Sequence, residues 1–349
     1  MSKLDKVLKS AAGNAGGDGA NVEDVFSTYL YEGGSGTITN GIDLAGEGGL
    51  VWVKRRDSAA NHHLVDSERG VSDGSSLRTL QTNNTGAAQA HNDITSFSST
   101  GFGLGGGDPV NDSSGTFTSW TFRKAPRFFD VVTYTGNGTA GREIAHDLGV
   151  APGMMVVKPV DEADDWSVYH RSSTSSPEDA YLKLNNVNAA ITAYSLGRWN
   201  STAPTDTVFT VGDDGGTNGN GYGEYVAYLF AHDPDGENDD GMIACGSYTA
   251  DGNDQTISLG WEPQWLLAKR TTAASDWWLI DTMRNWNTNV DDYLKPNSSN
   301  QEDNGNTDGY PTADGFVIKG SGNMGVNYAS TNQTIVYMAI RAPMMKEPE

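Results

Sequence analysis

The chain has 349 residues, a formal net charge of −22 and only 36% hydrophobic residues. Its length predicts two or three domains rather than one core. The excess of acidic over basic residues, 45 against 23, opposes binding to phosphate backbones and anionic membrane surfaces, so we expect no nucleic-acid partner. The 43 glycines, with many Asn, Asp, Ser and Thr, indicate short strands joined by turns.

Residues 1–24 are expected to form an N-terminal arm. Leu4, Val7 and Leu8 share one helical face before the sequence turns to Gly, Ala and Asn. A helix this short is not stable alone, so the arm is either a frayed terminus or a segment that orders on a partner. No signal-like apolar core opens the chain, and no apolar run is long enough to insert into a membrane. We therefore expect no cleavable signal, and release by lysis of a host cell.

Three related segments follow, each of about 105 residues, a period that indicates internal duplication. We expect them at 25–126, 127–236 and 237–349. The shared order is a tyrosine, a leucine before a turn, an apolar run that ends in lysine, and a large ring eight residues later. In chain order these are Tyr31, Leu44, Lys54 and His62; Tyr134, Leu148, Lys158 and Trp166; and Tyr248, Leu259, Lys269 and Trp277.

The last part of each repeat carries two further markers. An aromatic residue stands six positions before a proline in WTFRKAP, YLFAHDP and YMAIRAP, and a phenylalanine lies upstream of each. Spacing this regular predicts duplication of a whole folding unit. The aromatic residues are Trp120, Tyr228 and Tyr337, spaced by 108 and 109 positions, and the phenylalanines are Phe102, Phe209 and Phe316, spaced by 107 and 107.

The length of the repeat favours one architecture. Propeller blades and solenoid turns repeat at roughly 20 to 50 residues, whereas a whole immunoglobulin-like or jelly-roll sandwich needs about 100. We predict an all-β chain of three tandem β-sandwich domains, jelly-roll or lectin-like, each closing its own interior around aromatic residues.

The densest group of potential metal or acid/base side chains is in the first repeat. It comprises His62, His63, His91, Asp57 and Asp66. However, His62 aligns with tryptophans in the other two repeats, so we expect it to fill a packing position rather than to bind zinc. We therefore predict no catalytic residue and no metal site in this group.

The loop at residues 233–241, DPDGENDDG, alternates carboxylates in a way that offers oxygen ligands. It lacks the twelve-residue pattern of an EF-hand with its terminal glutamate. We expect an acidic, hydrated linker and no cofactor, with Ca²⁺ in this loop as the alternative.

Five of the nine tryptophans lie in the third repeat, and strand alternation sends Trp277 and Trp278 to opposite faces. Exposed aromatic rings beside Asn and Asp are typical of sugar-binding sites. We therefore predict an aromatic binding surface for a glycan or receptor at Trp277, Trp278 and Trp286. The alternative is that these rings pack against a neighbouring sheet or repeat.

Several phrases resemble a repeated β domain of tailed-phage virion structural proteins, especially tail-fibre-like proteins of marine phages. The similarity extends from about Phe26 to Pro343, and its phrases include FSTYLYEG, NGIDLAGEGGLVWVKRR, SWTFRKAPRFFDVVTYTGNGTAGREIAHDLGVAPGMMVVK, DDWSVYHR, YVAYLFAHD and GWEPQWLLAKR. The resemblance implies a non-enzymatic virion component and brings no catalytic residues.

The expected role is a tail fibre or tail-associated adhesin. The alternatives are a capsid decoration or head-fibre protein, and a glycan-binding or glycan-degrading module. The expected partners are other virion proteins, reached through the N-terminal arm, and a host surface glycan or receptor. We expect a homotrimer, as in other fibres, unless the three repeats supply a threefold arrangement within one chain.

Overall fold

The computed structural model describes residues 20–34, 36–70, 77–106, 109–192, 196–235, 241–320 and 332–343. It is nearly all β, with 46% strand and 6% helix, so the predicted all-β class is confirmed. No helix in these ranges has the length and apolar character needed to cross a membrane. Most of the predicted arm, residues 1–19, lies outside the described ranges.

The first repeat opens with the one-turn helix α2, and its strands are short and joined by turns. In chain order they are α2 (Val22–Val25), β1 (Phe26–Glu32), β2 (Thr37–Thr39), β3 (Gly49–Arg55), β4 (His63–Asp66), β5 (Arg78–Thr79), β6 (Gln89–Ala90), β7 (Ile94–Ser98), β8 (Gly101–Leu104) and β9 (Thr116–Arg123).

The second repeat has fewer strands than the first and has short helices in its later part. Its elements are β10 (Phe129–Thr135), β11 (Arg142–Ala145), β12 (Pro152–Pro159), β13 (Ser167–His170), η1 (Pro177–Asp179), β14 (Leu182–Lys183), α3 (Leu196–Trp199), β15 (Val208–Val211), α4 (Gly215–Asn218) and β16 (Glu224–Ala231).

The third repeat replaces those late helices with extra strands. Its elements are β17 (Ile243–Ala250), β18 (Gln255–Ser258), β19 (Pro263–Arg270), β20 (Trp277–Asp281), η2 (Thr282–Arg284), β21 (Asp291–Leu294), β22 (Asp303–Asn306), β23 (Gly309–Thr312), β24 (Gly315–Ile318) and β25 (Gln333–Arg341).

The main sheet of each repeat has one strand order: first, last, third and fourth strand of that repeat. The three sheets are β1-β9-β3-β4, β10-β16-β12-β13-β14 and β17-β25-β19-β20-β21-β22. A smaller outer sheet pairs the second strand of each repeat with the strand that precedes its last long one, as β2-β8-β7, β11-β15 and β18-β24-β23. The duplication seen in the sequence is therefore a duplication of topology.

The upstream phenylalanine marker identifies equivalent positions in the three outer sheets. Phe102 pairs with Ile38 in the β2–β8 ladder. Phe209 pairs with Ile144 and Phe316 with Ile257 in the corresponding ladders of the other repeats. All three phenylalanines are fully buried. These three residues therefore occupy equivalent ladder positions in the three repeats.

The aromatic marker before the proline is misaligned in the third repeat. Trp120 lies opposite Trp52, and Tyr228 opposite Val156. In the third repeat the residue at this place is Met338, opposite Leu267. Because a shift of one residue moves a side chain to the other face of a sheet, the aromatic ring of Tyr337 points away from the central cluster and packs on the outer side.

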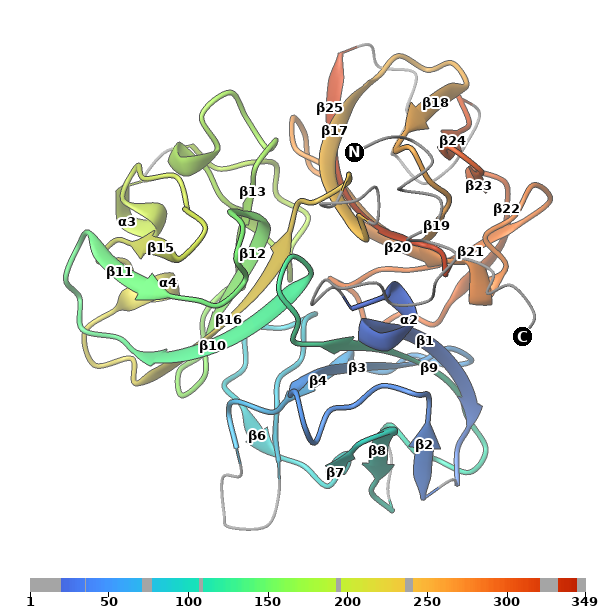
Figure 1. Ribbon diagram of the computed structural model, residues 1–349, viewed down its shortest axis with the longest axis horizontal. Helices are drawn as coiled ribbons and strands as arrows, with labels where there is room; N and C mark the ends of the chain where they lie inside the picture. Colours follow the sequence, from blue (N-terminus) through green and yellow to red (C-terminus); the bar gives the residue numbers. More distant parts are fainter. Residues whose placement is uncertain are drawn as a thin grey trace, which may run out of the picture.

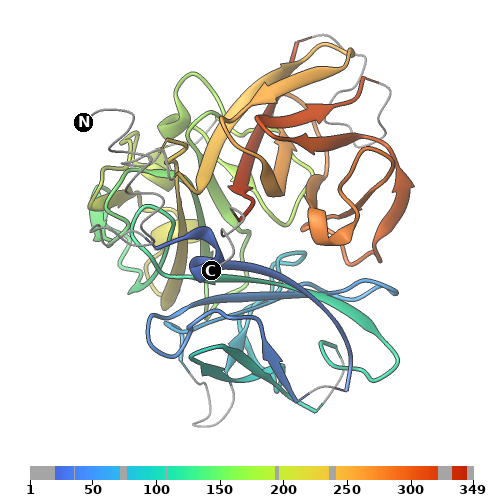
Figure 2. The ribbon, with the colours of Figure 1, turned by 45° about the vertical axis from the view of Figure 1, so that its right-hand side comes forward.

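The three repeats are arranged around a common centre, with α2 close to it (Figure 1). Figure 2 shows the same three lobes from a view turned by 45°. The largest apolar cluster includes Val25, Trp120, Tyr228 and Met338, and so draws on all three repeats. Two further clusters lie under the outer sheets of the third and first repeats. The prediction that each repeat closes its own interior is therefore wrong for the central core, which is shared.

The helix α2 falls partly within the predicted arm but belongs to this core. Val22 and Val25 are 5% and 0% exposed and are members of the central cluster. Asn21 and Asp24 form a capping box at its start, which satisfies donors that a helix N-terminus leaves open. The central core therefore includes residues on the arm side of the predicted boundary at 24/25.

Candidate functional site

The three rings that follow the buried lysines all lie at interfaces between repeats. His62, Trp166 and Trp277 stand opposite Lys54, Lys158 and Lys269 across neighbouring strands, as the registers of these ladders place them. Each ring nitrogen donates to a backbone carbonyl at the end of the fifth strand of the adjacent repeat, or one to two residues after it. The contacts are His62 Nε2 to Lys295 O at 3.1 Å, Trp166 Nε1 to Gln81 O at 3.1 Å and Trp277 Nε1 to Lys183 O at 2.8 Å.

His62 therefore fills the position of a tryptophan, as predicted. Trp52 Nε1 donates to His62 Nδ1 at 3.0 Å, and because an indole N–H only donates, the proton of the imidazole is on Nε2, which faces the Lys295 carbonyl. Burial, together with the charge of Lys54, holds the pKa of His62 well below its usual range. Both nitrogens of this neutral ring therefore make hydrogen bonds within the protein, to Trp52 and to the Lys295 carbonyl.

The other members of the predicted histidine group are engaged separately. His63 Nδ1 lies 2.7 Å from Asp93 Oδ2, Asp57 pairs with Arg55, and Asp66 pairs with Arg69. Across the residues that the structure describes, no three His, Cys, Asp or Glu side chains are placed to hold a metal ion. The structure brings only His63 and His91 together, beside Asp93 and with ring centroids 6.0 Å apart, and places the other three elsewhere.

An asparagine beside each ring completes a repeated motif that sequence reasoning missed. Asn83, Asn185 and Asn297 accept from the backbone N–H of the ring residue at 3.0, 3.0 and 2.8 Å. Their amide groups donate to the side chain that precedes the ring, a contact made to Asn61, Asp165 and Asp276. The signal was present as LQTN, LKLN and LKPN at residues 80–83, 182–185 and 294–297.

Backbone hydrogen bonds repeat across all three interfaces. The residue five positions after the motif asparagine donates to the second residue after the buried lysine of the next repeat: Ala88 to Val160, Ala190 to Thr271 and Glu302 to Arg56, at 2.8, 2.8 and 2.9 Å. In the opposite direction Asp164 donates to Thr85, Ser275 to Val187 and Ala60 to Ser299. We call these the 1–2, 2–3 and 3–1 interfaces. Because the third repeat contacts the first as the first contacts the second, the chain closes into a pseudo-threefold ring.

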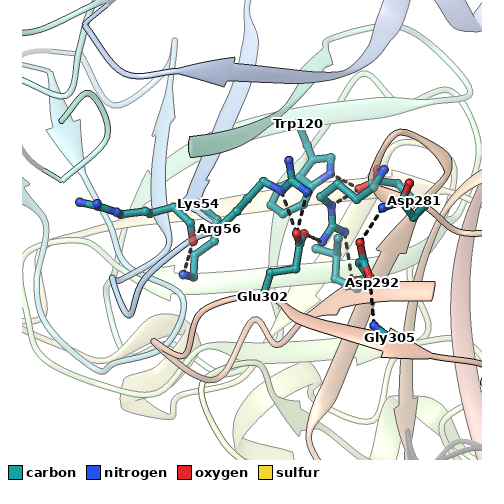
Figure 3. A network of polar contacts seen from close by, with 11 residues as sticks. Lys54, Arg56, Trp120, Asp281, Asp292, Glu302 and Gly305 are labelled. Atoms are coloured by element: carbon teal, nitrogen blue, oxygen red, sulfur yellow. Dashed lines mark hydrogen bonds and ion pairs between the residues drawn. The ribbon is translucent and has the colours of Figure 1, made fainter. Parts of the chain in front are cut away.

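The 3–1 interface contains a buried charge network (Figure 3). Glu302 accepts from Arg56 at 2.7 and 2.9 Å and from Arg284 at 2.9 Å. Arg284 also donates to Asp281 at 2.7 Å, and Trp120 Nε1 donates to the same carboxylate at 2.9 Å. Desolvation of these ions is offset only because each finds partners.

The 1–2 interface carries a reduced version of this network. Asp66 accepts from Arg69 at 2.5 Å and from the Tyr228 hydroxyl at 2.7 Å, as Asp281 accepts from Arg284 and Trp120. Ala88 stands where the 3–1 interface has Glu302, and Arg69 Nη1 has no hydrogen-bond acceptor among the described residues. The 3–1 and 1–2 interfaces thus share geometry but differ in charge.

At the 2–3 interface a histidine takes the place of the aspartate. His170 lies 3.0 Å through Nε2 from the carbonyl of Tyr337, while its Nδ1 accepts from the Ser172 N–H at 3.2 Å. Burial lowers the pKa of His170 to about 4. A neutral imidazole, rather than a carboxylate, joins these two repeats.

The three repeat lysines are fully buried beside the rings. Burial lowers the pKa of Lys54 and Lys158 to about 8 and that of Lys269 to about 7. Their ammonium groups donate to backbone carbonyls, for example Lys158 to Pro159 at 2.8 Å and Lys269 to Val187 across the 2–3 interface at 3.0 Å.

The predicted aromatic surface does not exist, because Trp277, Trp278 and Trp286 are only 1%, 6% and 1% exposed. Trp277 belongs to the central cluster and Trp278 to the outer cluster of the third repeat, where it packs on Tyr293 with ring centroids 4.8 Å apart. Alternation does send the two rings to opposite faces, but both faces of β20 are covered. The alternative, packing against sheets and repeats, is what the structure shows.

The predicted calcium loop falls mostly outside the described ranges, which omit residues 236–240. At its start Asp233 is bound by Arg127, through contacts of 2.5 and 2.8 Å. This carboxylate is therefore already paired with a cation.

Two clefts lie at pseudo-equivalent places on the ring. The larger, about 460 Å³, is at the 3–1 interface and is lined by Ala59, Tyr293, Lys295, Asn300, Gln301, Glu302, Asp303 and Asn304. The smaller, about 270 Å³, lies in the first repeat beside the 1–2 interface and is lined by Thr79, Gln81, Asn84, Gly86, Ala87, Gln89 and His91. Both lie beside the loop that follows the motif asparagine, and both are polar.

The fold and these contacts define an all-β protein in which three repeats close into one ring, with polar clefts at or beside two of its interfaces. The chain belongs to the family described as domain of unknown function (DUF7483), whose model matches residues 21–343. This match includes α2 and all three repeats as one domain. No curated protein matches the chain.

Proposed function

We propose that this protein is a non-enzymatic structural component of a tailed-phage virion, located in the tail apparatus, where it contacts the host surface as a tail fibre or adhesin. The observation that supports this most directly is the closed ring. Its repeats are joined by backbone hydrogen bonds at all three interfaces and by the Arg56–Glu302 ion pair at the 3–1 interface, which suits a rigid module that presents loops outward. The resemblance to tail-fibre-like repeats points the same way.

The titratable side chains support a structural rather than a catalytic role. Asp291 is the one carboxyl in the described ranges whose pKa is raised, to about 6, by burial and by the charge of Asp308. Its Oδ2 accepts from the backbone N–H groups of Asp308 and Gly309 at 2.6 and 2.8 Å, so it holds a turn. It does not line either cleft.

We further propose that each repeat is a small sandwich of a main sheet on an outer sheet, with boundaries near residues 126/127 and 236/237. The main and outer sheets recur three times in the same order, which supports three such units. The N-terminal arm is proposed to dock on another virion protein. Because α2 lies near the centre of the ring (Figure 1), the arm joins the folded part at that point.

The closed ring of repeats favours a single chain over the expected homotrimer. A fibre of three chains places three copies around one axis, whereas here one chain supplies three equivalent interfaces by itself. This supports the single-chain alternative, in which the protein continues a threefold fibre without two further copies. Light scattering of the purified protein separates the two assemblies, and a stable mass of three chains would restore the homotrimer.

The proposal is tested by locating the protein on the particle. Purified virions are labelled with an antibody raised against the ring and imaged, and we expect label on the tail. Label confined to the head would favour the decoration or head-fibre alternative, and particles without the protein would contradict a virion role. New reducing ends after incubation with host polysaccharide would contradict the non-enzymatic part.

A further inference from the structure

The cleft at the 3–1 interface has the size of a small-ligand site and a polar lining. Its volume of about 460 Å³ lies within the roughly 300–1,000 Å³ typical of such sites. Three exposed amides, Asn300, Gln301 and Asn304, line it. Among the described residues no side-chain hydrogen bond engages these three amides, although the Asn300 backbone N–H is fixed by Ser298 Oγ at 3.1 Å. Each amide offers both a donor and an acceptor to a ligand.

The charged groups of the same cleft are already paired within the protein. Lys295 lies 3.1 Å from Asp276 and 4.7 Å from the centre of the Trp278 ring. Asp303 accepts from the Tyr293 hydroxyl at 2.7 Å, and Glu302 is held by two arginines. The polar groups that remain available to a ligand are therefore the neutral amides of Asn300, Gln301 and Asn304.

The pseudo-equivalent places at the other two interfaces do not offer the same free amides as this cleft. At the 1–2 interface the amides bind within the protein: Gln81 accepts from Asn61 and Asn84, and Gln89 lies 3.1 Å from His91. At the 2–3 interface Ala189 and Ile191 occupy the positions of Gln301 and Asp303, as the shared spacing from the motif asparagine shows.

We propose that the 3–1 cleft binds a neutral oligosaccharide, with the three amides hydrogen-bonding its hydroxyl groups. This deepens the adhesin proposal and rests on it for the source of the sugar, a glycan of the host surface. A neutral sugar fits because hydroxyl groups need donors and acceptors in close alternation, as amides provide. An anionic polysaccharide is opposed by the net charge of −22.

The test uses an array of immobilised neutral oligosaccharides beside sulfated and uronate-containing ones, followed by titration calorimetry with the best neutral binder. We expect binding to neutral members. The triple substitution Asn300→Ala, Gln301→Ala, Asn304→Ala should weaken it by at least about tenfold, since several hydrogen bonds are lost. The matched control is Asn188→Ala, because Asn188 is exposed at the equivalent position of the 2–3 interface, and it should leave affinity unchanged.

Retention of no neutral oligosaccharide, binding of the anionic members alone, or equal affinity of the triple variant would overturn the inference. Circular dichroism of each variant confirms that the substitutions leave the ring folded. Virion labelling gives an independent answer on the proposed function. Tail label without sugar binding removes only this inference, whereas sugar binding without any virion label removes only the virion role.

Discussion

The imidazole Nε2 of His62 donates to the carbonyl of Lys295 at 3.1 Å, a contact that spans 233 positions of sequence and joins the last repeat to the first. At the other two interfaces a tryptophan N–H makes this contact. The histidine is accommodated because its second nitrogen accepts from Trp52, so one small ring serves as acceptor and donor at once.

Replacement of His62 by alanine should destabilise the protein by about 2–4 kcal/mol, since it leaves a cavity and strands two buried hydrogen-bonding groups. The free energy of unfolding in urea measures the change. His91→Ala is the control, because its side chain is 33% exposed, and we expect less than about 0.5 kcal/mol there. Equal effects of the two substitutions would contradict the assigned role of His62.

Substitution of Glu302 by alanine should cost about 3–5 kcal/mol, because it leaves the fully buried Arg284 without one of its two carboxylates and removes the partner of Arg56. Chemical unfolding again provides the measurement. Glu143→Ala, at an exposed carboxylate, is the matched control. A loss below about 1 kcal/mol would place the network among surface ion pairs.

Stability should rise with pH from about 7 toward 10 because of the repeat lysines. Their folded pKa values of about 7 to 8 lie below the unfolded value of about 10.4, so the unfolded chain binds more protons in this window and the free energy of unfolding increases with pH. Above the window the sign reverses, since burial raises the pKa of Tyr169 and Tyr337 to about 12. Denaturation midpoints measured from pH 7 to 11 should pass through a maximum, and Lys158→Met should flatten the rising limb.

On the acid side stability should fall between about pH 6.5 and pH 4 because of His170. Its folded pKa is about 4, below the unfolded value of about 6.5, so the unfolded chain takes up a proton that the folded chain does not. Asp291 acts in the opposite sense, since its pKa is raised to about 6. His170→Gln keeps a donor toward Tyr337 but does not titrate, and thermal melts should show a shallower acid limb for this variant. An unchanged limb would mean that other groups dominate.

Removal of the third repeat should prevent a stable fold rather than yield a shorter protein. A chain ending at residue 236 would expose the central cluster that Trp265, Leu267 and Met338 help to form, together with both interfaces of the third repeat. We expect strong binding of a hydrophobic dye and no cooperative unfolding transition. A monomeric fragment that unfolds cooperatively would instead support three self-sufficient domains.

Much of the fold follows from local pattern. The strand content, the period and the equivalence of His62 with Trp166 and Trp277 depend on short-range spacing, which survives duplication. The one-residue error at Tyr337 arises because Pro343 follows the end of the last strand by two positions, whereas Pro126 and Pro234 follow theirs by three. The register is set by the neighbouring strands of the sheet rather than by distance to the proline.

The candidate site could not be predicted in the same way. The burial of Trp277 and Trp278 depends on a central core and an outer sheet built from distant segments, so alternation alone cannot reveal which faces are covered. The cleft amides lie after the LKPN motif, in a part of the repeat where the three copies differ most in length. Ring closure likewise depends on contacts between the first and last repeats, which no local window contains.

The contact of Arg56 with Glu302 bridges 246 positions, and this has a kinetic consequence. Contacts between distant segments are slow to form, because a long loop must close before they contribute. During synthesis the first repeat must wait for the third repeat to emerge. Until then its side of the 3–1 interface is exposed to water and Arg56 lacks Glu302. Formation of the 3–1 interface should therefore be the last step of folding and should set the overall folding rate.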